Sequence, residues 1–395
     1  MTEIFIKKEQ EEKKIALVEN GILTEYYEEN KEDNRREGNI YIGIVRDIIK
    51  GMQSAFIDIG TEKNSFIHLK DVLPKVDEKK EKPENTLIDI TKVLKPNQKI
   101  IVQVKKDSNE QKGARVSTHI NLPGKYIVLL PETNIVTVSQ KIEDKKEQER
   151  LIKLVEENIS KNNGAIIRTS SQGKEKEIIE EIKILENKWN KICEKEVDAN
   201  SKKPELIYKS EDIVRKMLID LNSKNIENIF TNSKEEYEEL KEVIKGNKEY
   251  ENIKLQLGGK EVLGKYDLAS QIEKSRNRKV WLKCGGFITI DKTEALTAID
   301  VNTGKYIGGA NKLEQTIYKV NMEATIEIAK QLRLKDIGGI IIIDYIDMAK
   351  KEDKDKIEEL LKEELKKDRS KTQVEGFTKL DLMELTRKHI CSHKE

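Results

Sequence analysis

The stretch TEALTAIDVNTG at residues 293–304, together with GGIIIIDYIDM at residues 338–348, decides the fold of the carboxyl-terminal quarter of the chain. Each stretch contains an apolar run typical of a strand, and each run ends in an acidic residue, Asp300 in the first and Asp344 in the second. Asn302 follows Asp300 by two positions, so both side chains project to the same side of a strand. If the two strands are neighbours, three oxygen ligands meet at one end of a sheet.

The segment between the two stretches supports this arrangement. Apolar residues recur there at spacings of three and four, which predicts an amphipathic helix: Leu313, Ile317, Val320, Ala324, Ile328 and Leu332. A helix, a break at Gly338 and Gly339, and then an apolar strand is the order expected of a crossover unit.

Oxygen ligands at such a sheet end indicate a class of chemistry. Mg²⁺ is usually bound by one or two carboxylates together with substrate phosphate, so the set of Asp300, Asn302 and Asp344 has the outline of a phosphodiester-cutting site. The alternative is that the two aspartates only cap the helix or turn that follows each strand.

Composition narrows the class of protein. The chain has 395 residues, too many for one ordinary core, and we expect two to four domains. With 74 basic and 73 acidic side chains the formal net charge is +1, so any nucleic-acid surface must be a local patch. The amino terminus does not read as a signal peptide, no run approaches the roughly 18–20 apolar residues of a membrane span, and the cysteines form no disulfide framework. These features predict a soluble cytoplasmic protein.

Residues 39–71 predict a small barrel. In YIGIVRDIIKGMQSAFIDIGTEKNSFIHLKD, short strands alternate with turn residues. Four rings would lie on one face, namely Tyr41, Phe56, Phe66 and His68. Barrels of the OB type bind single strands by stacking bases on such rings, although aromatic residues in a small barrel can equally belong to its core. A nearby basic cluster could contact phosphates or be a solvated loop: Lys105, Lys106, Lys112 and Arg115.

A further candidate site lies at GAIIRTSSQG, residues 164–173. An apolar strand ends there in Arg168 and Thr169, and a predicted helix follows. A guanidinium fork, hydroxyl groups and free amides before a helix make a good anion site. Many strands end in Arg-Thr without binding anything, and that alternative stays open from the residues alone.

The motifs carry a resemblance to a known family. TEALTAIDVNTG, the helix ending in IAKQLRLKDIGG, and IIIDYIDM closely resemble the catalytic region of the ribonuclease E/G family, whose members are endoribonucleases, and the resemblance covers nearly the whole chain. It implies an α/β multidomain fold. An OB-fold RNA-binding barrel (39–119) is inserted in an inert ribonuclease H-like domain (1–38 plus 211–277), and a 5′-monophosphate sensor region (120–210) and a DNase I-like α/β catalytic domain (278–395) follow.

The resemblance also implies roles for residues. Asp300 and Asp344 match the aspartates that bind the catalytic Mg²⁺, and Asn302 matches an asparagine that holds the site together by hydrogen bonding. The expected RNA contacts are Phe56, Phe66, Lys106 and Lys112, and the expected 5′-phosphate contacts are Val128, Arg168 and Thr169. The barrel is similar to the OB-fold domain named after the largest protein of the small ribosomal subunit, which favours RNA contact for the two phenylalanines. Ser65 stands where many such domains have glycine.

The expected chemistry is metal-assisted hydrolysis. The resemblance implies that the substrate is single-stranded, A/U-rich RNA, that the products have 5′-phosphate and 3′-hydroxyl ends, and that the activity serves the processing and decay of messenger and ribosomal RNA. A 5′-monophosphate is expected to stimulate it. Two other classes of function stay open, a non-catalytic RNA-binding assembly factor and a Mg²⁺-dependent DNA nuclease. Contacts to the 2′-hydroxyl, which a sequence does not reveal, separate RNA from DNA.

The carboxyl terminus departs from the family. There, LMELTRK (382–388) is followed in the family by a paired-cysteine motif through which two subunits share one Zn²⁺, whereas this chain offers His389, Cys391 and His393. A structural zinc site needs four ligands, so each subunit would supply two. We expect that the chain lacks this zinc link, and that a homodimer or higher oligomer would rest on the catalytic domain and on helices after Asp353.

Overall fold

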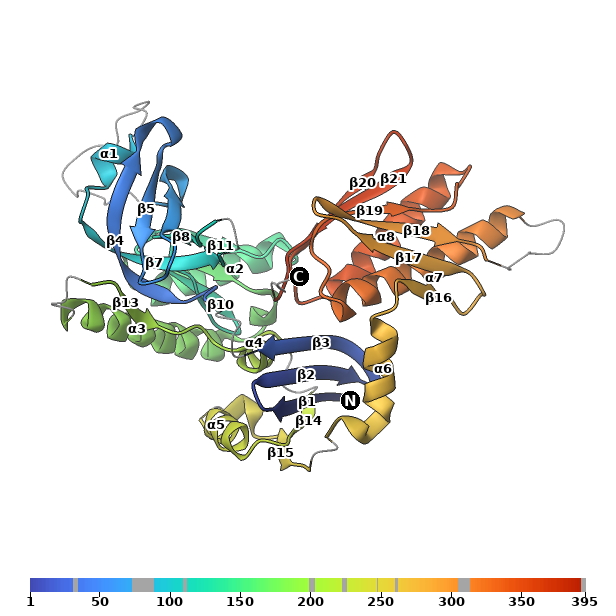
Figure 1. The fold of residues 1–395 in the computed structure, drawn as a ribbon, viewed down its shortest axis with the longest axis horizontal. Helices are drawn as coiled ribbons and strands as arrows, with labels where there is room; N and C mark the ends of the chain where they lie inside the picture. Colours follow the sequence, from blue (N-terminus) through green and yellow to red (C-terminus); the bar gives the residue numbers. More distant parts are fainter. Residues whose placement is uncertain are drawn as a thin grey trace. The chain divides into compact units, whose positions relative to one another are not determined.

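The computed structural model describes residues 1–30, 35–72, 89–108, 112–198, 203–221, 226–246, 248–259, 262–304 and 313–391. The chain forms two compact units, one made of Met1–Asp33 and Leu221–Glu395 and the other of Asn34–Asp220. Each unit combines helices with sheets, so the fold is mixed α/β (Figure 1). The division into four domains is finer than this and stays a prediction.

The first unit begins with a five-stranded sheet of order β15-β14-β1-β2-β3. Its strands are β1 (Thr2–Glu9), β2 (Glu12–Glu19), β3 (Ile22–Asn30), β14 (Ile226–Thr231) and β15 (Lys254–Leu257). Parallel pairing of β1 with β14 joins the amino terminus to the middle of the chain. Four helical segments accompany the sheet: α5 (Lys234–Lys245), η5 (Lys248–Tyr250), η6 (Val262–Asp267) and α6 (Leu268–Ser275).

Strand β3 was not predicted from the sequence. Leu23, Glu25 and Tyr27 are its inward residues, and the charged one hides the period-two pattern. Arg369 compensates the buried carboxylate, since its Nε donates to Glu25 Oε2 at 2.8 Å. Burial alone would raise the pKa of Glu25, but the charges of Arg369 and Arg333 outweigh that effect and hold the pKa below its usual value.

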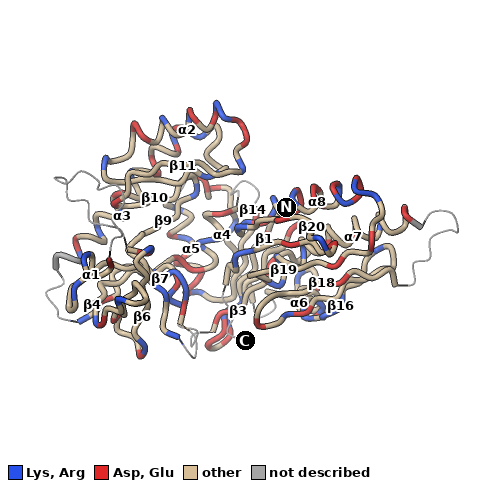
Figure 2. Tube along the Cα trace, turned by 90° about the horizontal axis from the view of Figure 1, so that it is seen from above, with Lys and Arg blue, Asp and Glu red and all other residues tan. Residues whose placement is uncertain are grey.

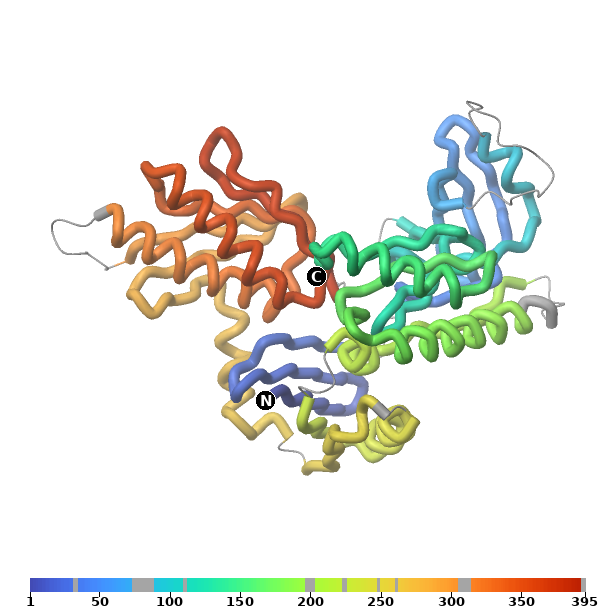
Figure 3. The backbone as a smooth tube through the Cα atoms, turned by 180° about the vertical axis from the view of Figure 1, so that it is seen from behind, coloured from blue at the N-terminus to red at the C-terminus, as the bar shows by residue number. Residues whose placement is uncertain are grey.

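A six-stranded sheet of order β16-β17-β18-β19-β21-β20 forms the rest of the first unit. Its strands are β16 (Lys279–Trp281), β17 (Phe287–Lys292), β18 (Leu296–Asn302), β19 (Gly339–Asp344), β20 (Thr372–Phe377) and β21 (Leu382–Arg387). Helices α7 (Leu313–Leu334) and α8 (Lys351–Lys366) pack on one face of it. Seen from behind, these two helices lie in front of the strands (Figure 3).

The expected crossover unit is confirmed. Strands β18 and β19 are parallel neighbours, and α7 lies between them in the chain. Four of the expected helix positions are fully buried against the sheet: Val320, Ala324, Ile328 and Leu332. Ile317 is partly buried, and the side chain of Leu313 lies outside the described part of the structure.

The segment after Asp353 differs from the expectation of several helices. Among the described residues there, α8 is followed by the antiparallel hairpin β20–β21. Strand β21 alternates between buried residues, Met383, Leu385 and Arg387, and more accessible ones. Because a buried arginine occupies one inward position, the apolar period is too short to be read as a strand.

The second unit contains the expected barrel. It has five strands, β4 (Ile40–Ile49), β5 (Ser54–Asp58), β6 (Ser65–His68), β7 (Lys99–Lys106) and β8 (Arg115–Ser117). Strand β4 pairs with both β5 and β7, which closes the sheet in the order β4-β5-β6-β8-β7. Short 3₁₀ turns η1 (Lys50–Met52) and η2 (Leu69–Asp71) and the helix α1 (Ile90–Val93) connect the strands. This closed barrel is consistent with an OB-like domain.

The rest of the second unit is a four-stranded sheet of order β11-β12-β10-β9 covered by two helices. Its elements are β9 (Leu122–Pro123), β10 (Ile127–Pro131), β11 (Val136–Val138), α2 (Lys145–Asn158), β12 (Asn163–Ile167), η3 (Thr169–Ser171) and α3 (Glu175–Asp198). Strand β13 (Glu205–Tyr208) pairs with barrel strand β4, and α4 (Ile213–Asp220) ends the unit.

Basic and acidic residues are interspersed on helices such as α2 and α8 (Figure 2). This matches the near-neutral formal charge of +1. No helix in the described ranges is both long enough and apolar enough to cross a membrane.

Candidate active site

Asp300 and Asp344 lie directly opposite each other where β18 and β19 end. The parallel register runs from Leu296 beside Ile340 to Asp300 beside Asp344. On β18 the residues Thr297, Ile299 and Val301 face the helices and are buried, whereas Ala298 and Asp300 are exposed. The strand neighbourhood on which the sequence interpretation depended is therefore present, and both carboxylates lie on the open face of the sheet.

Asn302 completes the row of polar side chains at this edge. Its Nδ2 donates a hydrogen bond to Asp300 Oδ2 at 2.5 Å. The contact fixes the orientation of the carboxylate before any ligand arrives. The three residues singled out from the sequence thus lie together.

Crowding of negative charge marks the site. Burial, followed by the charges of Asp300 and Asp347, raises the pKa of Asp344 above its usual value. Asp347 was missed by the sequence analysis, although it is exposed only three residues after Asp344. The signal that could have found it is the repeated acid in IIIDYIDM.

The loop that carries Asp347 is held by polar residues of α7. The amide of the fully buried Asn321 donates to Ile346 O at 2.8 Å and accepts from Ile346 N at 3.2 Å. One turn further along, Thr325 Oγ1 lies 2.9 Å from Tyr345 Oη. These two helix residues position the end of β19, and their signal is a polar residue on the otherwise apolar face of a helix.

The donor set suits a hard cation only in part. Among the described residues, no group of three histidine, cysteine, aspartate or glutamate side chains is arranged to hold a metal by itself. Mg²⁺, however, commonly takes one or two carboxylates and leaves its other positions to water and substrate phosphate. Asp300 and Asp344, exposed and mutually repelling, fit that requirement.

On the barrel, three of the four predicted RNA contacts, Phe56, Phe66 and Lys106, lie with Arg115 in one cross-strand row. Phe56 lies opposite Phe66, Phe66 is paired with Arg115, and Arg115 is paired with Lys106. The two rings are half-buried, with centroids 6.4 Å apart in an edge-to-face arrangement. They point away from the core because their strand neighbours Ala55, Ile57, Ser65 and Ile67 point into it.

Other members of the predicted cluster differ in placement. Tyr41 was expected beside the two phenylalanines, and this is wrong, because it is only 7% exposed and belongs to the barrel core. His68 lies two residues after Phe66 on β6 and is half-buried on the same face, as expected, and its Nδ1 also accepts from Lys70 N at 3.1 Å. Lys112 is exposed near the start of β8, and Arg115 also binds Asp71 at 2.8 Å.

Val128 and Arg168 project from the same face of the sheet in the second unit. Val128 pairs with Ile166, and the backbone of Arg168 donates to Tyr126 O at 2.8 Å. The guanidinium group is already engaged: Nη1 donates to Gly124 O at 2.8 Å and Nη2 to Asp220 Oδ1 at 2.6 Å. Thr169 begins η3 and is exposed.

Glu181 is a buried acid beside this pocket that the sequence analysis missed. Its carboxylate accepts hydrogen bonds from three consecutive backbone amides, those of Lys125, Tyr126 and Ile127, at 2.7 to 2.9 Å. Burial raises its pKa, and these bonds and the charge of Arg168 act in the opposite direction. The amides of Lys125, Tyr126 and Ile127 are therefore occupied from within the chain. The backbone groups of Gly124 are occupied as well, since its N–H donates to Ile127 O at 2.8 Å and its carbonyl accepts from Arg168.

Comparisons with known proteins bear on this arrangement. A model of the ribonuclease E/G family matches residues 121–390. Ribonuclease G of Escherichia coli K12 is 37% identical over 394 residues, which cover 98% of this chain and 79% of that protein. The chain belongs to the ribonuclease E/G family. Ribonuclease G of Haemophilus influenzae is 39% identical over 392 residues, with the same coverage of 98% and 79%. Ribonuclease E of a Nostoc species is 33% identical over 358 residues, or 89% of this chain and 51% of that protein.

The residues considered for a family-type zinc link lie at the far end of the same sheet. His389 Nδ1 is 2.8 Å from Asp336 O, and the backbone N–H of the buried Cys391 donates to Asp336 Oδ2 at 2.7 Å. His393 lies outside the described residues. Both described residues thus pack against Asp336, and the expectation about zinc stays untested.

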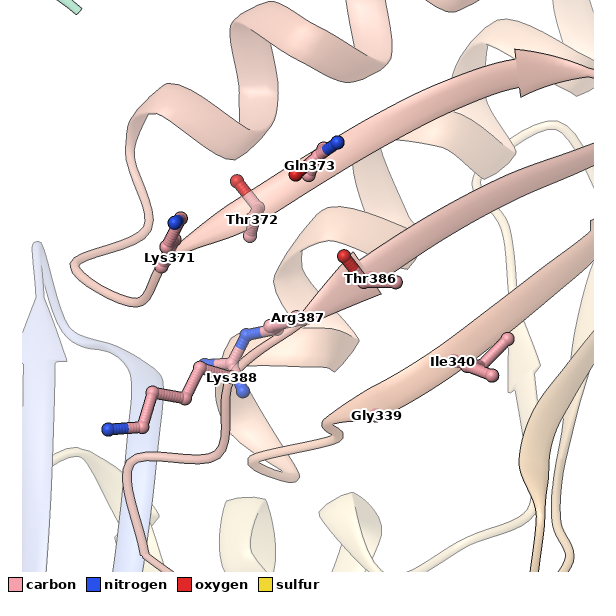
Figure 4. Close-up of a pocket in the computed structure, with 8 residues that line it drawn as sticks. All are labelled: Gly339, Ile340, Lys371, Thr372, Gln373, Thr386, Arg387 and Lys388. Atoms are coloured by element: carbon pink, nitrogen blue, oxygen red, sulfur yellow. The ribbon is translucent and has the colours of Figure 1, made fainter. Parts of the chain in front are cut away.

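A surface depression of about 390 Å³ lies beside this region (Figure 4). It is lined by Gly339, Ile340, Lys371, Thr372, Gln373, Thr386, Arg387 and Lys388. Gly339 begins β19 and Asp344 ends it, so the depression is at the opposite end of the strand from the paired carboxylates. It is not part of the candidate active site.

Proposed function

We propose that the chain is a Mg²⁺-dependent endoribonuclease that cuts single-stranded, A/U-rich RNA in RNA processing and decay and is stimulated by a 5′-monophosphate. The observation that carries the proposal is the in-register pair of Asp300 and Asp344 on an open sheet face in a member of the ribonuclease E/G family. A pure binder has no need of two uncompensated carboxylates where a phosphate must approach.

Asp300 and Asp344 are the residues that would hold the metal. Bound Mg²⁺ supplies Lewis-acid polarisation of the scissile phosphate and positive charge for the transition state. Asn302 restrains one of the two carboxylates through its hydrogen bond to Asp300. Because the pKa of Asp344 is raised, its carboxylate becomes protonated at a higher pH than an ordinary aspartate, and activity should fall earlier on the acid side.

The barrel row supports binding of unpaired RNA. Two half-buried rings and the cations of Arg115 and Lys106 follow one another across four strands. Stacking on an aromatic ring contributes about 1–3 kcal/mol per base, and the cations track the phosphates. Lys112 adds a further exposed cation near this row.

The 5′-monophosphate would be read by Arg168, Thr169 and Val128. Arg168 is pre-oriented by Gly124 and Asp220, so its fork loses little freedom when a phosphate binds. The four-domain architecture belongs to the same proposal, and it is supported by four separate sheets with their own apolar clusters. A cytoplasmic homodimer or higher homo-oligomer completes it.

One assay tests the function. The protein is incubated with internally labelled RNA bearing a 5′-monophosphate, the same RNA with a 5′-triphosphate, and single-stranded DNA, each with Mg²⁺ or with EDTA. We expect internal cuts in both RNAs with Mg²⁺, faster for the monophosphate, that yield 5′-phosphate ends. Binding without cutting would show an RNA-binding factor instead, and cutting of DNA at a comparable rate would show a general nuclease.

A further inference from the structure

Strand β16 at the edge of the six-stranded sheet carries an exposed tryptophan. Lys279–Trp281 forms this strand, which pairs antiparallel with β17. Of the two tryptophans in the chain, Trp189 is 7% exposed and buried in a core, whereas Trp281 is 61% exposed. An indole ring left in solvent beside a candidate active site needs an explanation.

Trp281 does not stand alone. Its ring meets that of Phe287 at 5.3 Å between centroids, at 61°. Lys279 Nζ lies over both rings, 4.2 Å from the centroid of Trp281 and 3.5 Å from that of Phe287. Such a cation–π contact contributes about 0.5–1 kcal/mol when exposed, enough to hold the cluster in one arrangement. The three residues are called the β16 platform below.

Strand register places the β16 platform beside the carboxylates. Trp281 lies opposite Phe287, and Phe287 lies opposite Asn302. The next row contains Lys279, Thr289, Asp300 and Asp344. Residues directly opposite one another in a sheet share a face, so the rings and the carboxylates lie on the same open side. Asp300 is two strand spacings across and two residues along from Trp281, about 12 Å away, and Asp344, one strand further, is about 16 Å away.

This spacing suits a nucleic-acid chain. About 12–16 Å corresponds to roughly four to five stacked nucleotides at about 3.4 Å each. A base that rests on Trp281 would therefore belong to a nucleotide within about five positions of a phosphate at Asp300 and Asp344. The ammonium group of Lys279 supplies positive charge for the intervening backbone, next to two carboxylates that would otherwise repel it.

We propose that the β16 platform stacks one unpaired nucleobase of the RNA substrate, within about five nucleotides of the scissile phosphate. This inference rests on the proposed function. A base held in a duplex does not expose its face to a ring, so the platform would add to the preference for single-stranded RNA. Stacking accepts any base, and we assign the platform no base identity.

The first test reads binding without cleavage. In EDTA, an unstructured oligouridylate is titrated into the protein, tryptophan fluorescence is recorded, and binding is followed in parallel by anisotropy of a labelled oligonucleotide. We expect wild-type emission to be quenched, and the emission of Trp281→Phe, which comes from the buried Trp189, to stay unchanged. Binding without any quenching in the wild type would overturn the proposal.

The second test measures the contribution to affinity and turnover. Trp281→Ala should weaken binding and lower kcat/KM about 5- to 150-fold, the range for one stacked base, and Trp281→Phe should recover most of the loss. The matched control is Leu380→Ala, which removes an 82% exposed apolar side chain from the turn between β20 and β21 of the same sheet. Equal behaviour of Trp281→Ala and Leu380→Ala would contradict the platform.

The third test locates the stacked base. A single abasic nucleotide is moved along the substrate, and we expect one position near the cut at which the wild type loses rate and Trp281→Ala loses no more. If Trp281→Ala cleaves RNA at the wild-type rate, the platform is contradicted and the proposed function is unaffected. Fluorescence quenching by RNA without any cleavage would support the platform and contradict the proposed function. Loss of oligomers in Trp281→Ala with unchanged RNA affinity would make the patch a contact between copies, also against the proposal.

Discussion

The same six-stranded sheet holds two pairs of aspartates, one at each end of β19, and they are built in opposite ways. Asp300 and Asp344 are exposed and face each other with Asn302 as the hydrogen-bond partner of the first. Asp336 and Asp368 are buried, at 0% and 2% exposure, and share Arg387 (Figure 4 shows this arginine). Arg387 donates from Nη1 to Asp336 at 2.8 Å and from Nε to Asp368 at 2.7 Å.

The difference separates carboxylates that are neutralised within the chain from carboxylates that are left open to solvent. The buried pair is neutralised within the chain, and Asp336 also accepts from the backbone amides of Ile390 and Cys391. Through these bonds, Asp336 joins the start of β19 to the carboxyl-terminal segment. The charges of the exposed pair repel each other, and burial and this repulsion raise the pKa of Asp344.

The largest effect is expected from Arg387→Leu. The substitution leaves two buried carboxylates without a counter-charge, and breaking a buried pair in this way costs about 3–5 kcal/mol. The free energy of unfolding from urea denaturation measures it. The control is Arg278→Leu, because Arg278 binds Asp291 on the surface, where the two side chains are 67% and 45% exposed, and such a pair contributes at most about 1 kcal/mol. Similar losses in both variants would mean that burial does not distinguish the two pairs.

The next effect is on turnover. Asp300→Asn or Asp344→Asn should lower cleavage about a hundredfold or more, the scale of losing a key transition-state contact, with RNA affinity nearly intact. Single-turnover rates and anisotropy measure the two quantities. Asp291→Asn serves as the control, because Asp291 lies on the adjacent strand and is paired with Arg278. Wild-type turnover in either active-site variant would remove Asp300 and Asp344 from the proposed site.

An intermediate case is Arg168, whose partner Asp220 is partly exposed. Removing the guanidinium in Arg168→Ala should cost about 1.5–3 kcal/mol on 5′-monophosphorylated RNA, the value of a charge-assisted hydrogen bond. That corresponds to roughly 10- to 150-fold in kcat/KM. Arg150→Ala, which removes an exposed arginine of α2 paired with Glu147 and Glu175, is the control. An equal loss on RNA with a 5′-hydroxyl would show instead that Arg168 supports the fold or contacts the RNA backbone generally.

The contrast also explains what the sequence could predict. The exposed pair was found because each aspartate ends an apolar strand, and local periodicity was enough to place α7 and the crossover between them. The buried group of Arg387, Asp336 and Asp368 was not found. A buried charge is recognisable only from its partners, and these three residues come from three separate segments of the chain. Glu25 in β3 hid a whole strand for the same reason.

Side-chain direction in the barrel was predictable only in part. Phe56 and Phe66 keep the strand alternation that the sequence suggested, whereas Tyr41 turns into the core. A ring on a strand faces inward or outward according to register, and register depends on the closure of β4 on β7, which no local pattern reveals. The exposure of Trp281 was equally hidden, since it follows from β16 being an edge strand.

The smallest expected effect concerns whether the repulsion between Asp300 and Asp344 lowers the free energy of unfolding. A raised pKa means that folded Asp344 holds its proton more tightly than in the unfolded chain, so the ionised form opposes folding. This burden is absent below the ordinary aspartate pKa of about 3.9 and grows as the pH rises through the raised value. Asp344→Asn should therefore raise the free energy of unfolding at pH 7 slightly, by about 0.5 kcal/mol at most for an exposed side chain, and the gain should vanish near pH 4.

Asp291→Asn provides a control of opposite sign for this measurement. The hydrogen bond from Arg278 lowers the pKa of Asp291, so its ionised form favours folding above the ordinary pKa, and that contribution is lost as the pH falls. Thermal unfolding of the two variants between pH 2 and pH 7 should thus give shifts in opposite directions at neutral pH. The gain from Asp344→Asn should vanish near pH 4, whereas the loss from Asp291→Asn should persist at pH 4 and vanish only as the pH falls through the lowered pKa of Asp291. A destabilised Asp344→Asn at pH 7 would show that this carboxylate, like the pair around Arg387, serves the fold.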